Sequence, residues 1–311
     1  MALDQATEKL LATLTHGNPP PLHQLDTQQA RAVMAGVRHL LEPGPELFQV
    51  CRHRLSVAPG QNIELRAYRP CAQSKGLMVF YHGGGWVLLD TQDYDSVLRL
   101  LAVESGYTVL SVDYRRAPEH PFPAPPDDAW QALLWADQQR FELTGNHDAA
   151  LIVIGDSAGG NLAAVVAQRA LRESRPHLAA QVLIYPVTQG DLSRPAYLQT
   201  SGPGLIGPQE MAWFWERYLP DPAQRLDPRA APLLASSLSG LPPTVLLLAE
   251  HDVLHDEGND YGTALQRAGV NVHTHSFAGQ IHGFFSFPGV LPAAGEARRF
   301  IVQCIEHLEL Q

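Results

Sequence analysis

The regular alternation of short apolar runs with helix-like segments is the feature that most constrains how this chain of 311 residues folds. Apolar or alternating runs bounded by Gly, Pro or Asp predict strands, and longer stretches with one apolar face predict helices between most of them. Strands that alternate with helices form a mostly parallel sheet with helices on both faces. We expect strands within residues 63–70, 76–85, 106–115, 150–160, 180–187, 243–252 and 271–279, and helices over 96–104, 127–138, 161–173 and 256–268.

Composition and charge limit the function classes open to the chain. A formal net charge of −10 disfavours nucleic acid as a partner, since phosphate binding requires clustered Lys and Arg. No run reaches the roughly 18 uncharged apolar residues of a membrane span, and the first residues, with Asp4 and Glu8, lack the pattern of a signal peptide. The three widely spaced cysteines, Cys51, Cys71 and Cys304, predict free thiols and a cytoplasmic location.

The N-terminal segment differs from the rest, because residues 1–45 contain helical patterns broken by Gly and Pro. One helix is predicted to begin with Thr27 as its N-cap and to stop at Pro43. We expect this segment to pack over the remaining structure as a helical arm.

A second segment, residues 190–235, interrupts the alternation of strands and helices. The main domain is therefore expected to comprise residues 46–189 and 236–311. Within the insertion, a predicted helix carries the dense apolar and aromatic set Met211, Trp213, Phe214, Trp215 and Tyr218. These side chains either pack the helix onto the body or, for one or two of them, line a pocket for an apolar substrate.

A serine at a tight corner is the strongest chemical signal in the chain. The segment Gly155-Asp156-Ser157-Ala158-Gly159 fits G-x-S-x-G, and it lies between a predicted strand and a predicted helix. That placement is typical of a nucleophile elbow, in which the serine Oγ is exposed at the edge of the sheet. Taken alone, the same pattern also fits a tight turn with a serine N-cap.

A serine hydroxyl needs a base, and the base needs an acid to orient it. Asp252 ends a later strand, and His282 follows the next strand in a glycine-flanked loop. Both are expected at the sheet edge that carries Ser157, in the order serine, acid, histidine. Asp256 and Glu257 are rival acids, but they fit the first turn of a helix.

Four other histidines raise the question of a metal, namely His251, His255, His273 and His275. The pair at 273 and 275 would share one face of a strand, where solvation is the simpler interpretation. We therefore expect no metal site.

Acyl transfer also requires a site that stabilises the developing negative charge, and the glycine run after the first buried strand can provide it. His82-Gly83-Gly84-Gly85 lets backbone N–H groups face a substrate carbonyl without interference from Cβ atoms. Gly84, Gly85 and Ala158 are the predicted oxyanion-hole donors. His82 and Gly83 are predicted to brace the loop. A phosphate-binding role is disfavoured, because neither dinucleotide nor P-loop spacing is present.

Taken together, these motifs resemble the hormone-sensitive-lipase-like bacterial esterases of the α/β-hydrolase fold. The matching segments, in chain order, are HGGGW (82–86), VDYRRAPEHPFPA (112–124), GDSAGGNLA (155–163), EHDVLHDEG (250–258) and IHGF (281–284). One departure is minor: Val253 and His255 stand where the family usually has Pro and Arg. The acid itself is retained.

The resemblance implies an α/β-hydrolase fold with a small helical cap built from residues 1–45 and 190–235. It also implies cofactor-free hydrolysis of carboxylic esters, and often a homodimer. Because the cap is small, we expect short- to medium-chain esters as substrates. Trp86, Tyr185 and Phe214 are candidates for lining the substrate pocket. The same triad also serves amidases, formamidases, lactonases and acyltransferases, and a non-catalytic binding protein can share the fold.

The stretch YRRAPEH (114–120) gives one further expectation. Asp113, Arg115 and Glu119 are expected to form a buried polar network behind the loop, with a structural role.

Overall fold

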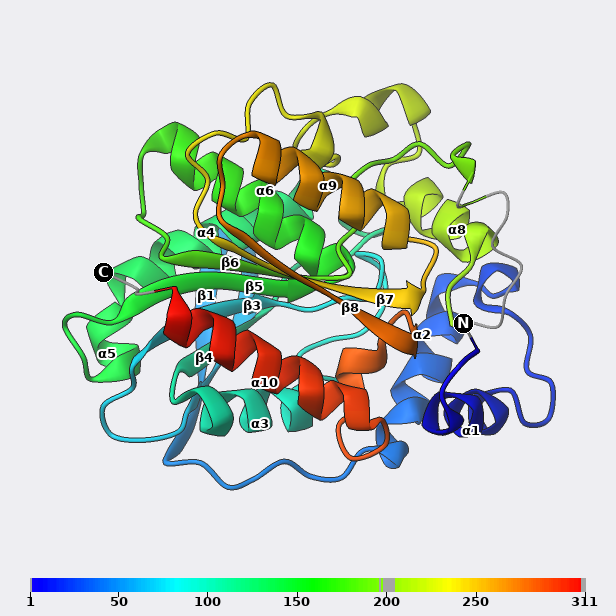
Figure 1. Ribbon diagram of the computed structural model, residues 1–311, viewed down its shortest axis with the longest axis horizontal. Coiled ribbons are helices and arrows are strands. Elements are labelled where there is room, and N and C mark those ends of the chain that lie inside the picture. Colours follow the sequence, from blue (N-terminus) through cyan, green and yellow to red (C-terminus); the bar gives the residue numbers. More distant parts are fainter. Residues whose placement is uncertain (1, 196, 198–204, 309–311) are drawn as a thin grey trace.

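Eight strands form one sheet in the computed structural model, which describes residues 2–195, 197 and 205–308 (Figure 1). The strand order is β1-β2-β4-β3-β5-β6-β7-β8. Pairs β1/β2 and β2/β4 are antiparallel, and all later pairs are parallel. The strands are β1 (Gln49–Ala58), β2 (Gln61–Arg69), β3 (Gly76–Tyr81), β4 (Thr108–Asp113), β5 (Ala150–Asp156), β6 (Ala180–Ile184), β7 (Thr244–His251) and β8 (Val272–Ile281).

Helices cover both faces of this sheet, as the alternation of strands and helices predicts. Helices α4, α6 and α9 lie on one face, and α3, α10 and α1 lie on the other (Figure 1). The described α-helices of the chain are α1 (Gln5–Leu14), α2 (Thr27–Gly36), α3 (Asp95–Ser105), α4 (Ala124–Gln138), α5 (Arg140–Thr144), α6 (Ala158–Glu173), α8 (Pro208–Tyr218), α9 (His255–Arg267) and α10 (Pro292–His307).

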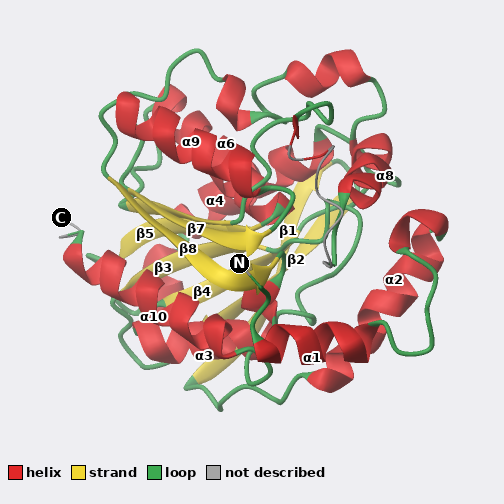
Figure 2. Ribbon diagram, turned by 45° about the vertical axis from the view of Figure 1, so that its right-hand side comes forward, coloured by secondary structure: helices red, strands yellow, loops and turns green. Residues whose placement is uncertain are grey.

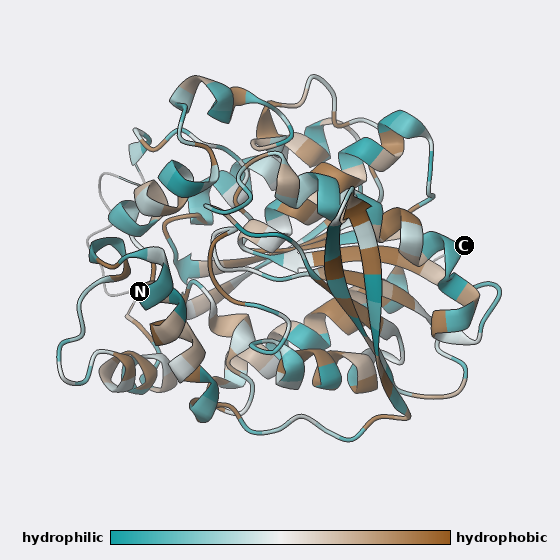
Figure 3. Cartoon of the chain, turned by 180° about the vertical axis from the view of Figure 1, so that it is seen from behind, coloured by the Kyte–Doolittle hydropathy of each residue, from teal (hydrophilic) through white to brown (hydrophobic). Residues whose placement is uncertain are grey.

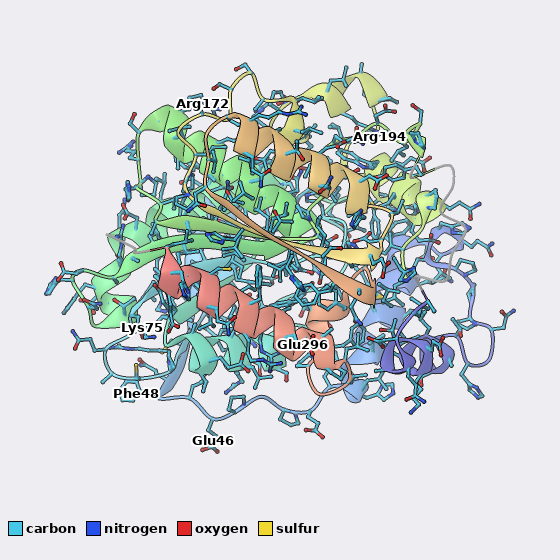
Figure 4. All side chains as sticks on the ribbon, viewed as in Figure 1. Glu46, Phe48, Lys75, Arg172, Arg194 and Glu296 are labelled. Atoms are coloured by element: carbon cyan, nitrogen blue, oxygen red, sulfur yellow. The ribbon has the colours of Figure 1, made fainter. Side chains whose placement is uncertain are left out.

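The core is divided by the sheet into two layers, because successive side chains of a strand point to opposite faces. In β3, Leu77, Val79 and Tyr81 enter the layer beneath α4 and α6, whereas Met78 and Phe80 enter the layer beneath α3 and α10. Figure 3 shows the central strands as mainly hydrophobic and the outer helices as mixed. Charged side chains such as those of Lys75, Arg172 and Glu296 point outward from the body (Figure 4).

The predicted strands are confirmed as β2 to β8, but the first strand was missed. Strand β1 pairs along its length with β2 and alternates between exposed and half-buried residues. Its half-buried side chains include Cys51, Leu55 and Val57, but His53 among them interrupts the apolar period. Helices α5 and α10 were also absent from the expected set.

The N-terminal segment lies at the end of the sheet where α8 also lies (Figure 2). Helix α2 is capped by Asp26, not Thr27, because Asp26 and Gln29 form a reciprocal capping box. The helix ends at Gly36, before the expected stop at Pro43, and continues as a short 3-10 turn over Val37–Leu40.

Polar contacts join the N-terminal segment to α8. The His23 ring lies 2.5 Å from a carboxylate oxygen of Glu210, and the Trp213 indole donates a hydrogen bond to the Leu25 carbonyl. Helix α8 belongs to the long connection between β6 and β7 that contains the predicted insertion. Residues 196 and 198–204 of that insertion lie outside the described residues.

Candidate active site

Ser157 occupies the sharp turn between β5 and α6, as the motif predicts. Its φ of 56° and ψ of −120° are unusual for a residue with a side chain. The Ser157 N–H donates to the Ile184 carbonyl, and its own carbonyl accepts from Asn161 and Val187, so the strained turn is held by backbone bonds. The side chain is 5% exposed.

Two glycines make this turn possible. A Cβ at Gly155 would overlap the Gly159 carbonyl, and a Cβ at Gly159 would overlap the carbonyl of Tyr81 in β3. Backbone thus packs on backbone on both sides of the serine, and no other residue fits either position.

His282 and Asp252 lie next to Ser157, although 125 and 95 residues separate them from it in sequence. The Ser157 Oγ is 2.8 Å from His282 Nε2. His282 Nδ1 is 2.7 Å from one carboxylate oxygen of Asp252, whose other oxygen accepts the Leu254 N–H at 2.9 Å. Asp252 follows β7 and His282 follows β8, so parallel strands bring the three side chains to one edge of the sheet.

Two opposing effects set the pKa of His282. Burial alone lowers it, since a charged ring is poorly solvated there. The charge of Asp252 and its hydrogen bond, followed by the charges of Asp156 and Glu257, outweigh burial and raise the pKa above its ordinary value. The ring is therefore a stronger base than a free histidine at the position where it meets the serine hydroxyl.

The glycine loop after β3 faces the serine turn with unused donors. Gly84 and Gly85 have positive φ values of 98° and 60°, and the Gly84 carbonyl accepts hydrogen bonds from Val87 and Leu88. Within the described part of the chain, the N–H groups of Gly84, Gly85 and Ala158 donate to no protein acceptor. An oxyanion site requires such unpaired N–H groups, and the assignment of these three as its donors stays a prediction.

His82 and Gly83 hold this loop from behind. The His82 ring is fully buried, stacks on Tyr114, and contacts the Gly83 carbonyl through Nδ1 at 2.8 Å. Burial is the main cause that lowers the pKa of His82 to about 4, so the ring is neutral near pH 7. The Gly83 N–H donates to Asp156 at 2.8 Å.

The three predicted pocket residues are almost completely enclosed. Trp86 stacks on Tyr218 at 4.0 Å between ring centroids, and Tyr185 lies 4.7 Å from the His282 ring. Phe214 lies against Gly85, where any Cβ would overlap its ring. The three rings support the loop and the histidine, and their role in lining a substrate pocket stays a prediction.

The expected network of Asp113, Arg115 and Glu119 is wrong, because the three side chains have different partners. Arg115 forms a forked ion pair with the fully buried Asp128. Glu119 pairs with Arg31 of α2 at the surface. Asp113 is the residue that lies behind the loop, 3.9 Å from His82, and burial raises its pKa to about 6.

Sequence reasoning treated Glu257 only as a rival acid, yet it is a buried anchor in the first turns of α9. Its carboxylate accepts from the Thr188 N–H at 2.8 Å, the Tyr197 hydroxyl at 2.8 Å and the Gln189 amide at 3.3 Å. Burial raises its pKa to about 7 despite these donors. Glu257 thereby fixes the start of the 190–235 insertion beside the Asp252 loop. No sequence pattern indicated these partners.

The described residues offer neither a metal site nor a helix that could span a membrane. The described residues contain no group of three or more His, Cys, Asp or Glu side chains arranged to hold a metal ion. His275 instead packs against Phe277 and Phe300. Among the helices that the structure describes, none combines the length and the apolar character needed to cross a membrane.

A serine on a strand–helix elbow, an acid and a histidine after later strands, and a glycine loop after β3 define the α/β-hydrolase class. A family model described as alpha/beta hydrolase fold matches residues 78–286. The chain belongs to this family, in its hormone-sensitive-lipase-like branch of esterases.

Individual relatives agree along most of the chain. It is 41% identical to a carboxylesterase, NlhH, of Mycobacterium tuberculosis over 76% of this chain and 75% of that protein. It is 34% identical to an ethyl acetate hydrolase of Pseudomonas putida over 93% of both. A hyperthermophilic esterase from the archaeon Pyrobaculum calidifontis has a similar structure, with a TM-score of 0.92, 34% identity and complete coverage of both chains.

Proposed function

We propose that this chain is a carboxylesterase that hydrolyses short- to medium-chain esters through an acyl-enzyme on Ser157. The observation that carries the proposal is the continuous contact from Ser157 Oγ through His282 to Asp252, beside three unused N–H groups. The named relatives are ester hydrolases, which supports the same reaction class here.

Acylation follows from the contacts of Ser157. His282 Nε2 accepts the hydroxyl proton while Oγ attacks the ester carbonyl carbon. Asp252 keeps the ring oriented through Nδ1 and stabilises its positive charge. The N–H groups of Gly84, Gly85 and Ala158 bind the carbonyl oxygen as it becomes negative. The intermediate collapses, the C–O bond breaks, and His282 returns the proton to the leaving alcohol.

Deacylation repeats these roles with water as the nucleophile. His282 accepts a proton from water, the water oxygen attacks the acyl carbon, and the same N–H groups bind the second oxyanion. Collapse releases the carboxylic acid, and the proton returns to Ser157 Oγ. The chemistry requires no metal or cofactor at any step.

Access to the serine defines the second part of the proposal. Ser157 and His282 are 5% and 4% exposed, so a substrate reaches them only past the segments around them. We propose that residues 1–45 and 190–235 form a small cap over a main domain of residues 46–189 and 236–311. The contacts of His23 and Leu25 with α8 join the two parts. A cap of this size favours short and medium acyl chains.

Location and assembly are proposed on fewer observations. Cys51, Cys71 and Cys304 are free thiols, which supports a reducing cytoplasm. A homodimer remains a proposal from the family resemblance, and sedimentation velocity tests it.

The test is hydrolysis of p-nitrophenyl esters from acetate to palmitate by the wild type, Ser157→Ala and Ser56→Ala. Ser56 is an exposed serine of β1 and serves as the matched control. We expect turnover that is greatest at short or medium chains, and a loss of roughly 10⁴-fold or more in kcat for Ser157→Ala only. Mass spectrometry is expected to find the acyl group on Ser157. Absence of turnover by the folded wild type on every chain length would refute the proposal, and amides and lactones would then be tested.

A further inference from the structure

Asp156, the residue before the nucleophile, is a buried carboxylate that the reaction described above does not use. It is 3% exposed. The G-x-S-x-G pattern requires glycines on either side of the serine but leaves this position free in type. Burying a charge without hydrogen-bond partners costs free energy, so a buried carboxylate needs donors around it.

The surroundings of Asp156 form a closed hydrogen-bonded unit between the elbow and the oxyanion loop. One carboxylate oxygen accepts the Gly83 N–H at 2.8 Å, and the other accepts the Tyr94 hydroxyl at 2.9 Å. The Gly83 N–H also lies 3.0 Å from the Tyr94 oxygen. A Cβ at Gly83 would lie 2.6 Å from the carboxylate, so the loop approaches as closely as a glycine allows.

This unit fixes one end of the segment that carries the oxyanion-hole donors. Gly83 directly precedes Gly84 and Gly85, whose N–H groups are free. At the other end, the Gly84 carbonyl is bound by Val87 and Leu88. The two donors are therefore held between two anchors. Asp156, which directly precedes Ser157, links the first anchor to the nucleophile elbow. A shift of a few tenths of an ångström in either anchor would move the donors out of line with the Ser157 Oγ.

The charge of Asp156 also acts on the base. It is one of the three carboxylates, with Asp252 and Glu257, that raise the pKa of His282. Burial raises the pKa of Asp156 itself to about 6, while the Tyr94 hydrogen bond, His282 and the Gly83 N–H oppose that rise. The charge of Asp156, after burial, also raises the pKa of the Tyr114 and Tyr185 hydroxyls, so both buried rings stay uncharged.

We propose that Asp156 is a positioning residue that fastens the oxyanion loop to the nucleophile elbow through Gly83 and Tyr94 and supports the positive charge of His282. This inference rests on the proposed esterase function and deepens it. The Asp156 carboxylate is hydrogen-bonded to Gly83 and Tyr94 and not to the Ser157 Oγ or the His282 ring. It acts through the Gly83 backbone and through the field at the imidazole.

Two substitutions separate the two effects. Asp156→Asn keeps the shape and removes the charge, so His282 loses part of its support and its pKa falls. Tyr94→Phe keeps the carboxylate but removes a donor, so the pKa of Asp156 rises and its charge is lost at a higher pH. Asp128→Asn is the matched control, because Asp128 is a fully buried carboxylate that pairs with Arg115 instead.

The experiment measures kcat and KM for p-nitrophenyl butyrate from pH 5 to 9, normalised to active sites titrated with a p-nitrophenyl phosphonate. For Asp156→Asn we expect kcat to fall roughly 10- to 100-fold with little change in KM. The acid limb of its kcat/KM profile should move about half a pH unit lower. For Tyr94→Phe the limb should move in the same direction by a smaller amount, because Asp156 is then ionised over a narrower pH range, and the loss of kcat should also be smaller. Asp128→Asn should keep the wild-type profile per active site.

Several results would overturn the proposal. One is a wild-type kcat and pH profile in Asp156→Asn, and another is a loss confined to the number of titratable sites. If Asp156→Asn does not fold, an unchanged acid limb in Tyr94→Phe overturns it. Failure of the esterase function is recognised separately, because the wild type would then not turn over. In that case the rate of Ser157 phosphonylation in the same variants still reports whether Asp156 positions the loop.

Discussion

The elbow at Ser157 and the N-terminal helix α2 are held in place by different means. At the elbow, backbone packs directly on backbone, and Gly159 leaves no space for one additional carbon atom against β3. Helix α2 is attached by side chains, chiefly Arg31, which donates to the Val87 and Ala117 carbonyls and to Glu119. Its glycine, Gly36, has no atom within 4 Å of the place where a Cβ would stand.

The difference separates the proposed catalytic region from the proposed cap. Backbone contacts cannot rotate away, so the elbow keeps the Ser157 Oγ and the proposed oxyanion donors in register. Side-chain contacts at the surface are individually weak and can exchange with water. The same type of substitution should therefore have opposite consequences in the two regions.

The largest difference is expected between Gly159→Ala and Gly36→Ala. The first forces a Cβ into the Tyr81 carbonyl, so the free energy of unfolding should fall by about 3 kcal/mol or more, with loss of activity. The second places alanine in open space in a helical conformation and should raise that free energy by about 0.5 kcal/mol. Urea unfolding measures both. Equal effects at the two sites would contradict the comparison.

Phe214 tests the place where the proposed cap reaches the elbow region. It comes from α8, is 1% exposed, and packs its ring on Gly85. Phe214→Ala should lower the free energy of unfolding by about 3 kcal/mol and lower kcat as the loop loosens. Phe141→Ala, at a surface phenylalanine, is the control, with an expected cost of under about 1 kcal/mol. Unchanged kcat in Phe214→Ala would show that the cap does not support the loop.

The pH dependence of stability tests the buried anchor Glu257. Its pKa is about 7 in the folded protein, against an ordinary value of 4.5 for glutamate, so the folded state binds its proton more tightly. Stability should therefore fall as pH rises from about 4.5 to 7. Asp156 contributes in the same direction, because its pKa is raised to about 6.

Glu257→Gln should flatten that slope and gain about 1–3 kcal/mol at pH 8 relative to the wild type. Urea unfolding at pH 5, 6.5 and 8 measures the effect. A slope that is equally steep in the variant would show that Glu257 is not the group that titrates.

The smallest effects are expected at the surface contacts of Arg31, which attach α2 to the Val87 and Ala117 carbonyls and to Glu119. Arg31→Ala removes hydrogen bonds to two carbonyls as well as the ion pair and should cost about 1–2 kcal/mol. Glu119→Gln removes only the exposed ion pair and should cost less than about 1 kcal/mol. Thermal denaturation of the two variants ranks them. A larger loss in Glu119→Gln would mean that charge, and not the carbonyl contacts, holds the helix.

Sequence was a sound guide where residue type and chain position are both restricted. A serine between two close-packed glycines, an acid and a histidine after parallel strands, and a glycine run after β3 each have few structural solutions. The fold was predictable for the same reason, because buried parallel strands are continuous apolar runs. Strand β1 was not predicted because His53 interrupts the apolar alternation of its inward face.

Side-chain partners were much less predictable. Arg115 pairs with Asp128 and not with its sequence neighbours, because the turn into α4 places that carboxylate beside it. Asp156 meets Tyr94 across 62 residues, and Glu257 meets Tyr197 across 60. Such contacts depend on how loops pack between distant elements, and a single sequence carries no pattern for them.

The contacts of the N-terminal segment also determine the order in which its helices can dock during synthesis. The segment is made before its partners. Glu119 follows Arg31 after 88 residues, Glu210 follows His23 after 187, and Gln280 follows Thr7 after 273. At translation rates of about 5–20 residues per second, His23 waits roughly 10–40 s for its partner. Helix α2 can therefore dock early, α8 joins it later, and α1 is fastened last. The buried Leu10 and Leu11 of α1 stay uncovered on the ribosome for most of the translation time.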